Sequence, residues 1–495
     1  MESRSCAPSC FPWKGGILSW VGFTLVVLGL LALSTPQALA GGKAAKYRRT
    51  SSDRLYTLIE RGDVEEFKKV LDKTPKAIEE EGEDLIENAA LAWQWEILQY
   101  LCEKGAKLEI APAGDESLLW EVCGGSVDDF WGISTSKKSS KAKKPEKSDK
   151  TRLQDSVETV KILVSKGFSL KESHEGETLL DVAAGVGNVE LVRYFIEQKL
   201  PVDAGAERIL DSLLDEELNS LEIVELLLKA GAKTVVLDPR TNEVKWSIMH
   251  EAIGHEGWLE VLIKNGVALD TMYDGIQPLH KAVLQKEDKD VHLLVEKGAS
   301  LNARTDRGWT PVLLAMLDDL EMVKYLESKG ADLSAITDND CDALFIAADF
   351  GKADIVEYLL SKKFDTKRVN INGESLAFAA AMGGNEELFK KIYALNPDPK
   401  QKDIWGQTLL FAAVYSGNVK IAEFLLEAGV PVNEFRQDGQ TAMNVAREND
   451  KNEMIDFLRK HGGKETLNPI DSKDSGLGSN LDVRRAYSFG GGNFM

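Results

Sequence analysis

The stretch from Asp274 to Gly298, DGIQPLHKAVLQKEDKDVHLLVEKG, contains the features of the unit from which most of this chain is built. It opens with Asp274-Gly275, a pair suited to a tight turn that needs a positive φ. A short helix with small residues such as Ala282 is expected next, followed by a helix with apolar residues at three- and four-residue spacing. Gly298 can adopt the left-handed conformation that ends this second helix. Because so short a helix pair cannot bury its own apolar face, neighbouring units must stack.

Two markers repeat with one period along the chain. Glycine recurs at Gly266, Gly298, Gly330 and Gly429 with steps of 32, 32 and 99 residues, and 99 is three times 33. A small residue recurs in step at Ala252, Ala282, Ala315, Ala347, Ala380, Ala413 and Ala446. Agreement between two markers indicates an internal repeat of about 33 residues, which predicts a solenoid.

The unit resembles the ankyrin repeat, whose family phrase is Asp-x-x-Gly-x-Thr-Pro-Leu-His followed by Ala-Ala, a Leu-rich helix and Gly-Ala. The best matches are Gln277-Pro278-Leu279-His280 and Thr310-Pro311-Val312-Leu313. The resemblance covers roughly Asp53 to Gly462, about twelve units, and is strongest from Glu175 onward, whereas Glu207 to Ser220 departs from the pattern. It implies an all-α ankyrin-repeat solenoid of helix-turn-helix units joined by β-hairpin loops, over residues 53–466.

The first forty residues have the order of a secretory signal peptide. A polar start is followed by an uncharged, mainly apolar run from Ile17 to Leu33 and by Ala38-Leu39-Ala40, a small-x-small cleavage signal. Residues 1–40 are therefore predicted to be a signal peptide, and 41–52 a linker. The long apolar run and the basic residues after Gly42 leave a retained membrane anchor with a cytosolic body as the alternative.

Two further segments are not expected to pack. The spacing from Gly105 to Gly167 leaves an excess of residues at about 124–155, and Ser and Lys dominate its middle. This composition predicts a basic disordered insertion, with an anion-binding or nuclear-import patch as the alternative. The Gly- and Ser-containing residues 467–495 are predicted to be a disordered tail.

Composition and spacing argue against several classes of function. The chain has 495 residues, 43% of them apolar, and a formal net charge of -20, which disfavours nucleic acid and anionic membranes as general partners. The cysteines of the body, Cys102, Cys123 and Cys341, lie far apart and without zinc spacing. His250 and His255 are five residues apart, whereas a zinc protease helix needs four. Neither an enzyme nor a cofactor or metal is predicted, and the resemblance implies that His250 and His280 brace turns.

The position two residues after each marker alanine faces the groove in ankyrin repeats, and here it includes Leu317, Met382 and Tyr415. Trp309 and Trp405 are expected on the hairpins. Large apolar and aromatic side chains are good contact residues. The predicted partner-binding residues are therefore Trp309, Leu317, Met382, Trp405 and Tyr415, with inner-helix packing as the alternative role for the same side chains.

Three functions are compatible with the sequence. The first is an exported protein-protein interaction module, periplasmic or secreted, that binds a partner through the concave groove and the hairpin tips, and the acidic net charge favours a basic partner. The second is a membrane-anchored cytosolic scaffold, which requires a retained leader. The third is a hydrolase with an unrecognised site. The sequence does not indicate an oligomeric state.

Overall fold

The computed structural model describes residues 51–108, 117–124, 149–174, 176–202, 210, 213–214 and 221–466. The predicted signal peptide or anchor of residues 1–40, most of the predicted linker of 41–52 and the predicted tail of 467–495 lie outside these residues. Contacts divide the chain into two units, Met1–Arg54 and Leu55–Met495. The helix Ser51–Arg61 crosses this boundary, and the other described elements belong to the second unit.

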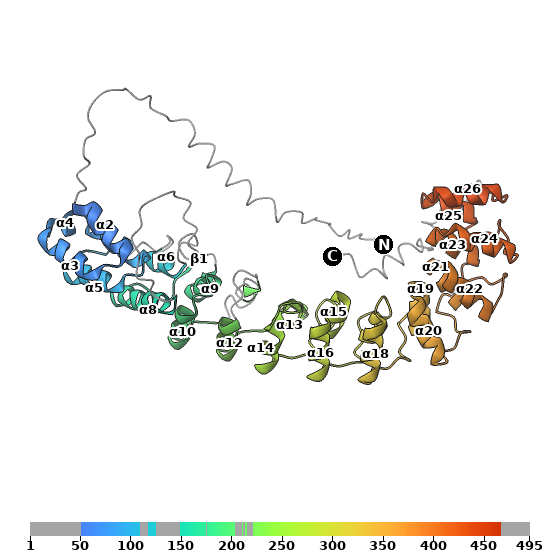
Figure 1. Ribbon diagram of the computed structural model, residues 1–495, viewed down its shortest axis with the longest axis horizontal. Helices are drawn as coiled ribbons and strands as arrows, with labels where there is room; N and C mark the ends of the chain where they lie inside the picture. Colours follow the sequence, from blue (N-terminus) through green and yellow to red (C-terminus); the bar gives the residue numbers. More distant parts are fainter. Residues whose placement is uncertain are drawn as a thin grey trace, which may run out of the picture. The chain divides into compact units, whose positions relative to one another are not determined.

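Pairs of short helices make up the described part of the chain, as the all-α prediction expects (Figure 1). In the N-terminal part they are α2 (Ser51–Arg61), α3 (Val64–Lys73), α4 (Lys76–Leu91), α5 (Trp95–Glu103), α6 (Leu118–Gly124), α8 (Asp149–Ser165), α9 (Leu179–Gly185), α10 (Val189–Glu197) and α12 (Leu221–Lys229). The later ones are α13 (Ile248–Glu251), α14 (Trp258–Lys264), α15 (Pro278–Gln285), α16 (Asp288–Glu296), α17 (Pro311–Ala315), α18 (Leu320–Ser328), α19 (Ala343–Asp349), α20 (Ala353–Ser361), α21 (Leu376–Gly383), α22 (Glu386–Leu395), α23 (Leu409–Ser416), α24 (Val419–Glu427), α25 (Ala442–Glu448) and α26 (Asn452–Lys460).

The helices stack in two layers. The first helices of successive units contact one another in the order α19, α21, α23, α25, and the second helices in the order α22, α24, α26. We call them the inner and outer helices. Each inner helix also packs against the outer helix of its own unit, as α23 does against α24. This arrangement is the stacked solenoid that the repeat predicts.

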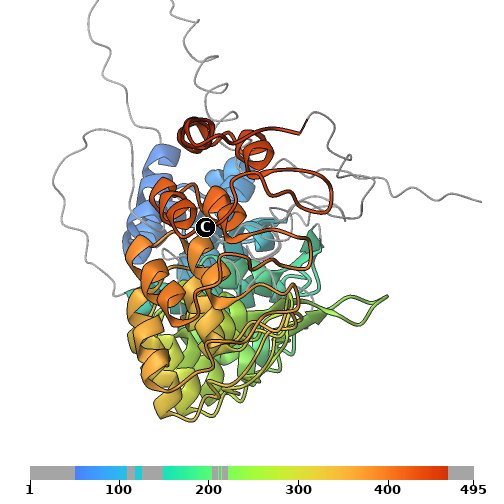
Figure 2. The same cartoon turned by 90° about the vertical axis from the view of Figure 1, so that its right-hand side faces the viewer.

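Hairpin loops join the units, and Figure 2 shows these loops gathered on one side of the helices. Two of them contain strands: β1 (Ser173–His174) pairs antiparallel with β2 (Glu177–Thr178), and β3 (Val235–Leu237) with β4 (Val244–Ser247). Single antiparallel bridges close the later hairpins, between Tyr273 and Ile276, Ile336 and Asp342, Val369 and Ser375, Lys402 and Thr408, and Phe435 and Thr441. The predicted β-hairpins are therefore present, most of them as minimal ones.

The unit of α23 and α24 shows why the sequence folds this way. Nearly every residue of α23 is apolar, because this helix is enclosed by its neighbours. Only one side of α24 is apolar, and it buries Ile421, Ala422 and Leu425. Asn418 starts α24, since its side-chain oxygen accepts from the backbone N–H of Ile421 at 3.1 Å. The marker glycines take positive φ as predicted, for example 91° at Gly429.

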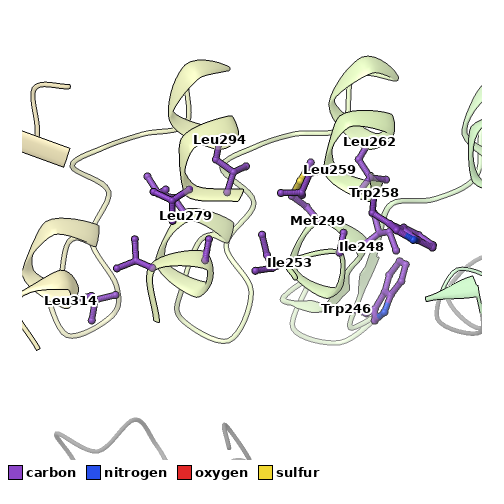
Figure 3. Close-up of a cluster of buried hydrophobic side chains, with 14 of the residues drawn as sticks. Trp246, Ile248, Met249, Ile253, Trp258, Leu259, Leu262, Leu279, Leu294 and Leu314 are labelled. Carbon is purple, nitrogen blue, oxygen red and sulfur yellow. The ribbon is translucent and has the colours of Figure 1, made fainter. Parts of the chain in front are cut away.

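One continuous apolar core runs through the stacked units. Figure 3 shows part of this core. Trp258 and Leu262 of α14 lie in one unit, and Leu279 of α15 and Leu294 of α16 lie in the next. Full burial of each such side chain stabilises the fold by about 1.5–3 kcal/mol. Because the core crosses every boundary between these units, no unit is independent of its neighbours.

The predicted boundaries need one correction. Helix α8 begins at Asp149, so residues 149–155 are helical and do not belong to the disordered insertion predicted for about 124–155. Val157 and Val160, which follow this stretch in α8, are buried in the core. Residues 125–148 lie outside the described part. The count of about twelve units stays a prediction, because most of Glu207 to Ser220 is also outside it.

Candidate functional site: the hairpin tips

Backbone hydrogen bonds tie the later hairpins into a ladder. The N–H of one residue at the tip of each hairpin donates to a carbonyl oxygen of the hairpin before it. These bonds run from Asp306 to Gly275 (3.4 Å), Asp338 to Arg307 (3.1 Å), Ile371 to Asn339 (3.1 Å), Ile404 to Asn372 (2.9 Å) and Gln437 to Trp405 (2.9 Å). Arg307, Asn339, Asn372 and Trp405 each directly follow the donor residue of their own hairpin, and Asp274 has the corresponding position before Gly275. Asp274, Asp306, Asp338, Ile371, Ile404 and Gln437 therefore form one line, which we call the tip row.

All six side chains of the tip row are exposed, and their chemistry changes halfway along it. The first three are aspartates, and the next two are isoleucines. Val369 and Phe435 of the same hairpins are exposed as well, and together with Ile371 and Ile404 they are between 48% and 63% exposed. We call these four residues the apolar strip. Large apolar side chains this exposed on neighbouring loops are typical of an interaction site.

Glycines allow the tip row to lie close to the preceding hairpin. Gly275 has a φ of 75°, and a Cβ built on it would come 2.7 Å from Oδ2 of Asp306. At Gly308, with a φ of 77°, the same atom would come 2.4 Å from Oδ1 of Asp338. A larger residue would strain the backbone and displace the carboxylate of the next hairpin. The glycines therefore fix the spacing of the acidic half of the row.

In the two hairpins of Ile371 and Ile404, the residue before the tip position is buried and braces its own hairpin. Asn370 accepts from the N–H groups of Asn372 and Glu374, both at 3.0 Å. Asp403 accepts in the same way from Trp405 at 2.9 Å and Gln407 at 2.8 Å. Oδ2 of Asp403 is buried without a hydrogen-bond partner among the described residues, and burial raises the pKa of this carboxyl to about 6.

In the last hairpin the inward position is occupied by Arg436, which needs a different brace. Its Nε donates to both oxygens of Asp438, at 2.8 and 2.7 Å, and its Nη1 donates to the hydroxyl of Tyr415 at 3.0 Å. Asp438 is 1% exposed and accepts from the N–H of Gln440 in turn. The buried ion pair therefore lies within the hairpin, and the hydrogen bond from Arg436 to Tyr415 joins the hairpin to inner helix α23.

Two histidines brace the earlier hairpins. Nδ1 of buried His280 accepts from the N–H of Gln277 at 3.2 Å, and its Nε2 lies 3.1 Å from the carbonyl oxygen of Ala303 and 3.3 Å from that of Trp309. Nε2 of His250 lies 3.1 Å from the carbonyl oxygen of Ile276. These contacts place both histidines in the structural role implied by the resemblance, and burial lowers the pKa of each.

The structure separates the predicted contact residues into two groups. Trp309 and Met382 are 8% and 7% exposed and pack in the core, which corrects their expected role as surface anchors. Leu317, Trp405 and Tyr415 are half-buried, so part of each side chain remains accessible. The close stacking of inner helices around the small residues of α21 covers Met382.

Sequence reasoning missed the apolar strip. The signal was available, because aligning the hairpins at steps of 32 and 33 places Asp306, Asp338, Ile371 and Ile404 in one column. An isoleucine at a loop position that is aspartate in the preceding repeats indicates a surface that binds another molecule. The prediction instead followed the inner helices, where large side chains serve packing as well.

Other chemistry finds little support in the described residues. No group of three or more His, Cys, Asp or Glu side chains there is placed to hold a metal ion. Burial raises the pKa of Cys341 to about 12 and that of Cys123 further, so neither thiol is a ready nucleophile. Within the same part of the chain, no helix has the length and apolarity needed to cross a membrane.

Comparison with known proteins agrees with this geometry. A family model described as ankyrin repeats in three copies matches residues 216–305, 291–371 and 376–468, about half of the chain. Protein phosphatase 1 regulatory subunit 27 of Mus musculus is 41% identical over 75 residues, which is 15% of this chain and 49% of that protein. Ankyrin repeat and KH domain-containing protein mask-1 of Caenorhabditis elegans is 26% identical over 265 residues, 52% of this chain and 9% of that protein.

A putative ankyrin repeat protein of Rickettsia felis is 30% identical over 189 residues, 36% of this chain and 46% of that protein. The chain spans about half the length of the phosphatase subunit and of the Rickettsia protein, and much less of mask-1. What these relatives share with the chain is therefore the repeat, and not a whole protein.

Proposed function

This chain belongs to the ankyrin-repeat family, and we propose that it binds a partner protein through the apolar strip and the adjoining inner helices. Ankyrin repeats are protein-protein interaction modules, so a protein partner is the expected ligand. The finer assignment is supported by the strip itself, in which Val369, Ile371, Ile404 and Phe435 leave apolar surface open to solvent on three consecutive hairpins. The half-buried side chains of Trp405 and Tyr415 extend this surface toward the concave groove that the resemblance implies.

Energetics favour this surface over the charged faces of outer helices such as α20 and α24. Covering exposed apolar area contributes about 25 cal/mol per Å² to association. A few aromatic and large aliphatic residues usually dominate such an interface. The outer helices present mainly charged residues to solvent, and their surface ion pairs contribute little to binding or stability.

Site-specific photocrosslinking tests this assignment. A photoreactive residue replaces Ile404 in the full chain, produced in its native host, and a second version carries it at Glu423, which is exposed on outer helix α24. We expect a discrete crosslinked protein from position 404 that is absent from position 423. It should disappear when Ile371→Ser and Phe435→Ser are added. Equal crosslinking from both positions, or none from position 404, would contradict the proposal.

We also propose that the protein acts after export, in a periplasm or outside the cell. Support comes from the order of the leader, in which the apolar run ends in Ala38-Leu39-Ala40. Sequencing the N-terminus of the mature protein tests it, and we expect Gly41 as the first residue. A mature chain that retains residues 1–40 would favour the membrane-anchored scaffold instead.

A further inference from the structure

The tip row has two ends with different chemistry. Asp274, Asp306 and Asp338 occupy one end, and Ile371 and Ile404 the other. The backbone bond from Ile371 to Asn339 joins the two halves directly, with no hairpin between them. A ligand bound along the tip row therefore contacts an acidic surface up to Asp338 and an apolar surface from the next hairpin, that of Ile371, onward.

Charges beside the row reinforce the difference. Around the acidic half, from 270 to 276, 302 to 308 and 334 to 340, the further charged residues are Asp270, Asp340, Arg304 and Arg307. Around the apolar half, from 367 to 373, 400 to 406 and 433 to 439, they are Lys367, Arg368, Lys400, Lys402, Arg436, Asp403, Glu434 and Asp438. Counted with the three tip aspartates, acidic groups prevail in the first set, and basic groups prevail in the second. A cationic segment is thus attracted more strongly to the first half than to the second.

The three tip aspartates differ in their ion pairs. Asp338 forms an ion pair with Arg304 at 2.8 Å. No lysine or arginine of the described residues forms an ion pair with Asp274 or Asp306, and both side chains are exposed. A Cβ built on Gly275, the residue after Asp274, would come 2.7 Å from Oδ2 of Asp306, so the carboxylate of Asp306 lies against the preceding hairpin.

We propose that the tip row binds an extended segment of a partner protein in which a cluster of Lys and Arg lies next to large apolar residues. The basic cluster lies over Asp274 and Asp306, and the apolar residues cover Ile371, Ile404 and Phe435. This inference rests on the proposed function, since it names the partner of the same surface. The charge asymmetry also fixes one orientation, because the reversed segment would place its cations beside Lys367 and Lys400.

Peptide selection tests the partner's chemistry even though the partner's sequence is unknown. A display library of random peptides is selected on the immobilised full chain, on Asp274→Lys/Asp306→Lys and on Ile371→Ser/Ile404→Ser. A control carries Glu423→Lys/Glu453→Lys, which changes charge equally on the exposed faces of α24 and α26. Circular dichroism and melting curves establish that each variant is folded as the original chain.

We expect the original chain and the control to enrich peptides that carry both a basic block of Lys and Arg and an apolar block of large side chains. The aspartate variant should lose the basic block, and the isoleucine variant the apolar one. A selected peptide should bind the aspartate variant about tenfold more weakly, and this difference should shrink between about 50 mM and about 300 mM salt, because screening weakens exposed charges.

The possible failures are distinguishable. Enrichment of apolar peptides without a basic block would overturn the bipartite segment and leave the proposed function standing. Equal loss of the basic block in the control would also overturn it. Enrichment of no peptide would overturn the extended segment even if position 404 crosslinks, and failure of both experiments would overturn the proposed function too.

Discussion

The hairpins on either side of Asp340 share one backbone ladder but are braced by different side chains. On the N-terminal side, neutral His250 and His280 hold carbonyl oxygens of the hairpins. On the C-terminal side, Asp403 accepts from backbone N–H groups of its hairpin, and the last hairpin contains the buried ion pair of Arg436 and Asp438. The repeat therefore determines the backbone of the hairpins but not which side chains brace them. The brace then decides how each region responds to mutation and to pH.

The largest effect is expected from Arg436→Met. This change leaves the carboxylate of Asp438, which is 1% exposed, without its cation in a buried site. The loss should be about 3–5 kcal/mol, because an uncompensated buried charge is strongly unfavourable. Hydrogen exchange of amides in α25 and α26 measures it. As the matched control, Arg304→Met removes an exposed Arg–Asp pair and should cost at most about 1 kcal/mol. Similar losses in both variants would contradict the charged brace.

Acid should destabilise the histidine-braced region. Burial, aided by Lys281 and His280 and partly opposed by the contact with Ile276, lowers the pKa of His250 from 6.5 to about 4. Because this folded-state pKa is below the unfolded value, the unfolded chain binds protons first as the pH falls below about 6.5. Stability should drop by about 3 kcal/mol between pH 6.5 and 4. Exchange of amides in residues 267–285 reports it, and His250→Asn should weaken the trend and leave the part due to His280, whose pKa burial also lowers.

His280→Leu should cost about 2 kcal/mol at neutral pH. Leucine fills most of the space, as Leu313 does at the equivalent position, so the loss reports on hydrogen bonds and not on a cavity. The N–H of Gln277 and the carbonyl oxygen of Ala303 would lose their partner. Denaturant unfolding gives the value, and a neutral result would mean that water replaces the histidine without cost.

The smallest effect, and one of opposite sign, is expected from Asp403→Asn. The pKa of Asp403 is raised from 3.8 to about 6, so its charge opposes folding above that pH and the folded chain gains stability as the pH falls through 6 toward 3.8. Asparagine should raise stability by about 1 kcal/mol at pH 7 and abolish this gain. The rise in the pKa of Asp403 from 3.8 to about 6 corresponds to about 3 kcal/mol. The gain expected from asparagine is smaller, because an amide accepts hydrogen bonds more weakly than a carboxylate. Asn370 is the natural precedent. Lower stability of the variant at pH 7 would contradict the argument.

Much of the fold followed from local patterns. The positions of Gly298 and Gly429 predicted left-handed helix ends, and both residues take positive φ. The family phrase around His280 predicted a braced turn, and Nε2 of His280 lies within hydrogen-bond distance of the carbonyl oxygens of Ala303 and Trp309. The end of the insertion was misplaced, because the polar start of α8 does not differ in composition from a loop.

The candidate site was predicted less well, and the reason lies in packing. Trp309 and Met382 have the residue types of contact positions, but whether such a side chain faces solvent depends on the neighbouring unit. Helix ends depend on a few neighbouring residues, and the period and fold class follow from the regular spacing of Gly and Ala along the chain, so the sequence by itself determined them. Exposure of the apolar strip and continuity of the tip row depend on hydrogen bonds between residues about 32 positions apart, such as Ile404 and Asn372. Only the stacked tertiary structure brings those residues together, and it alone decided which surface is left for a partner.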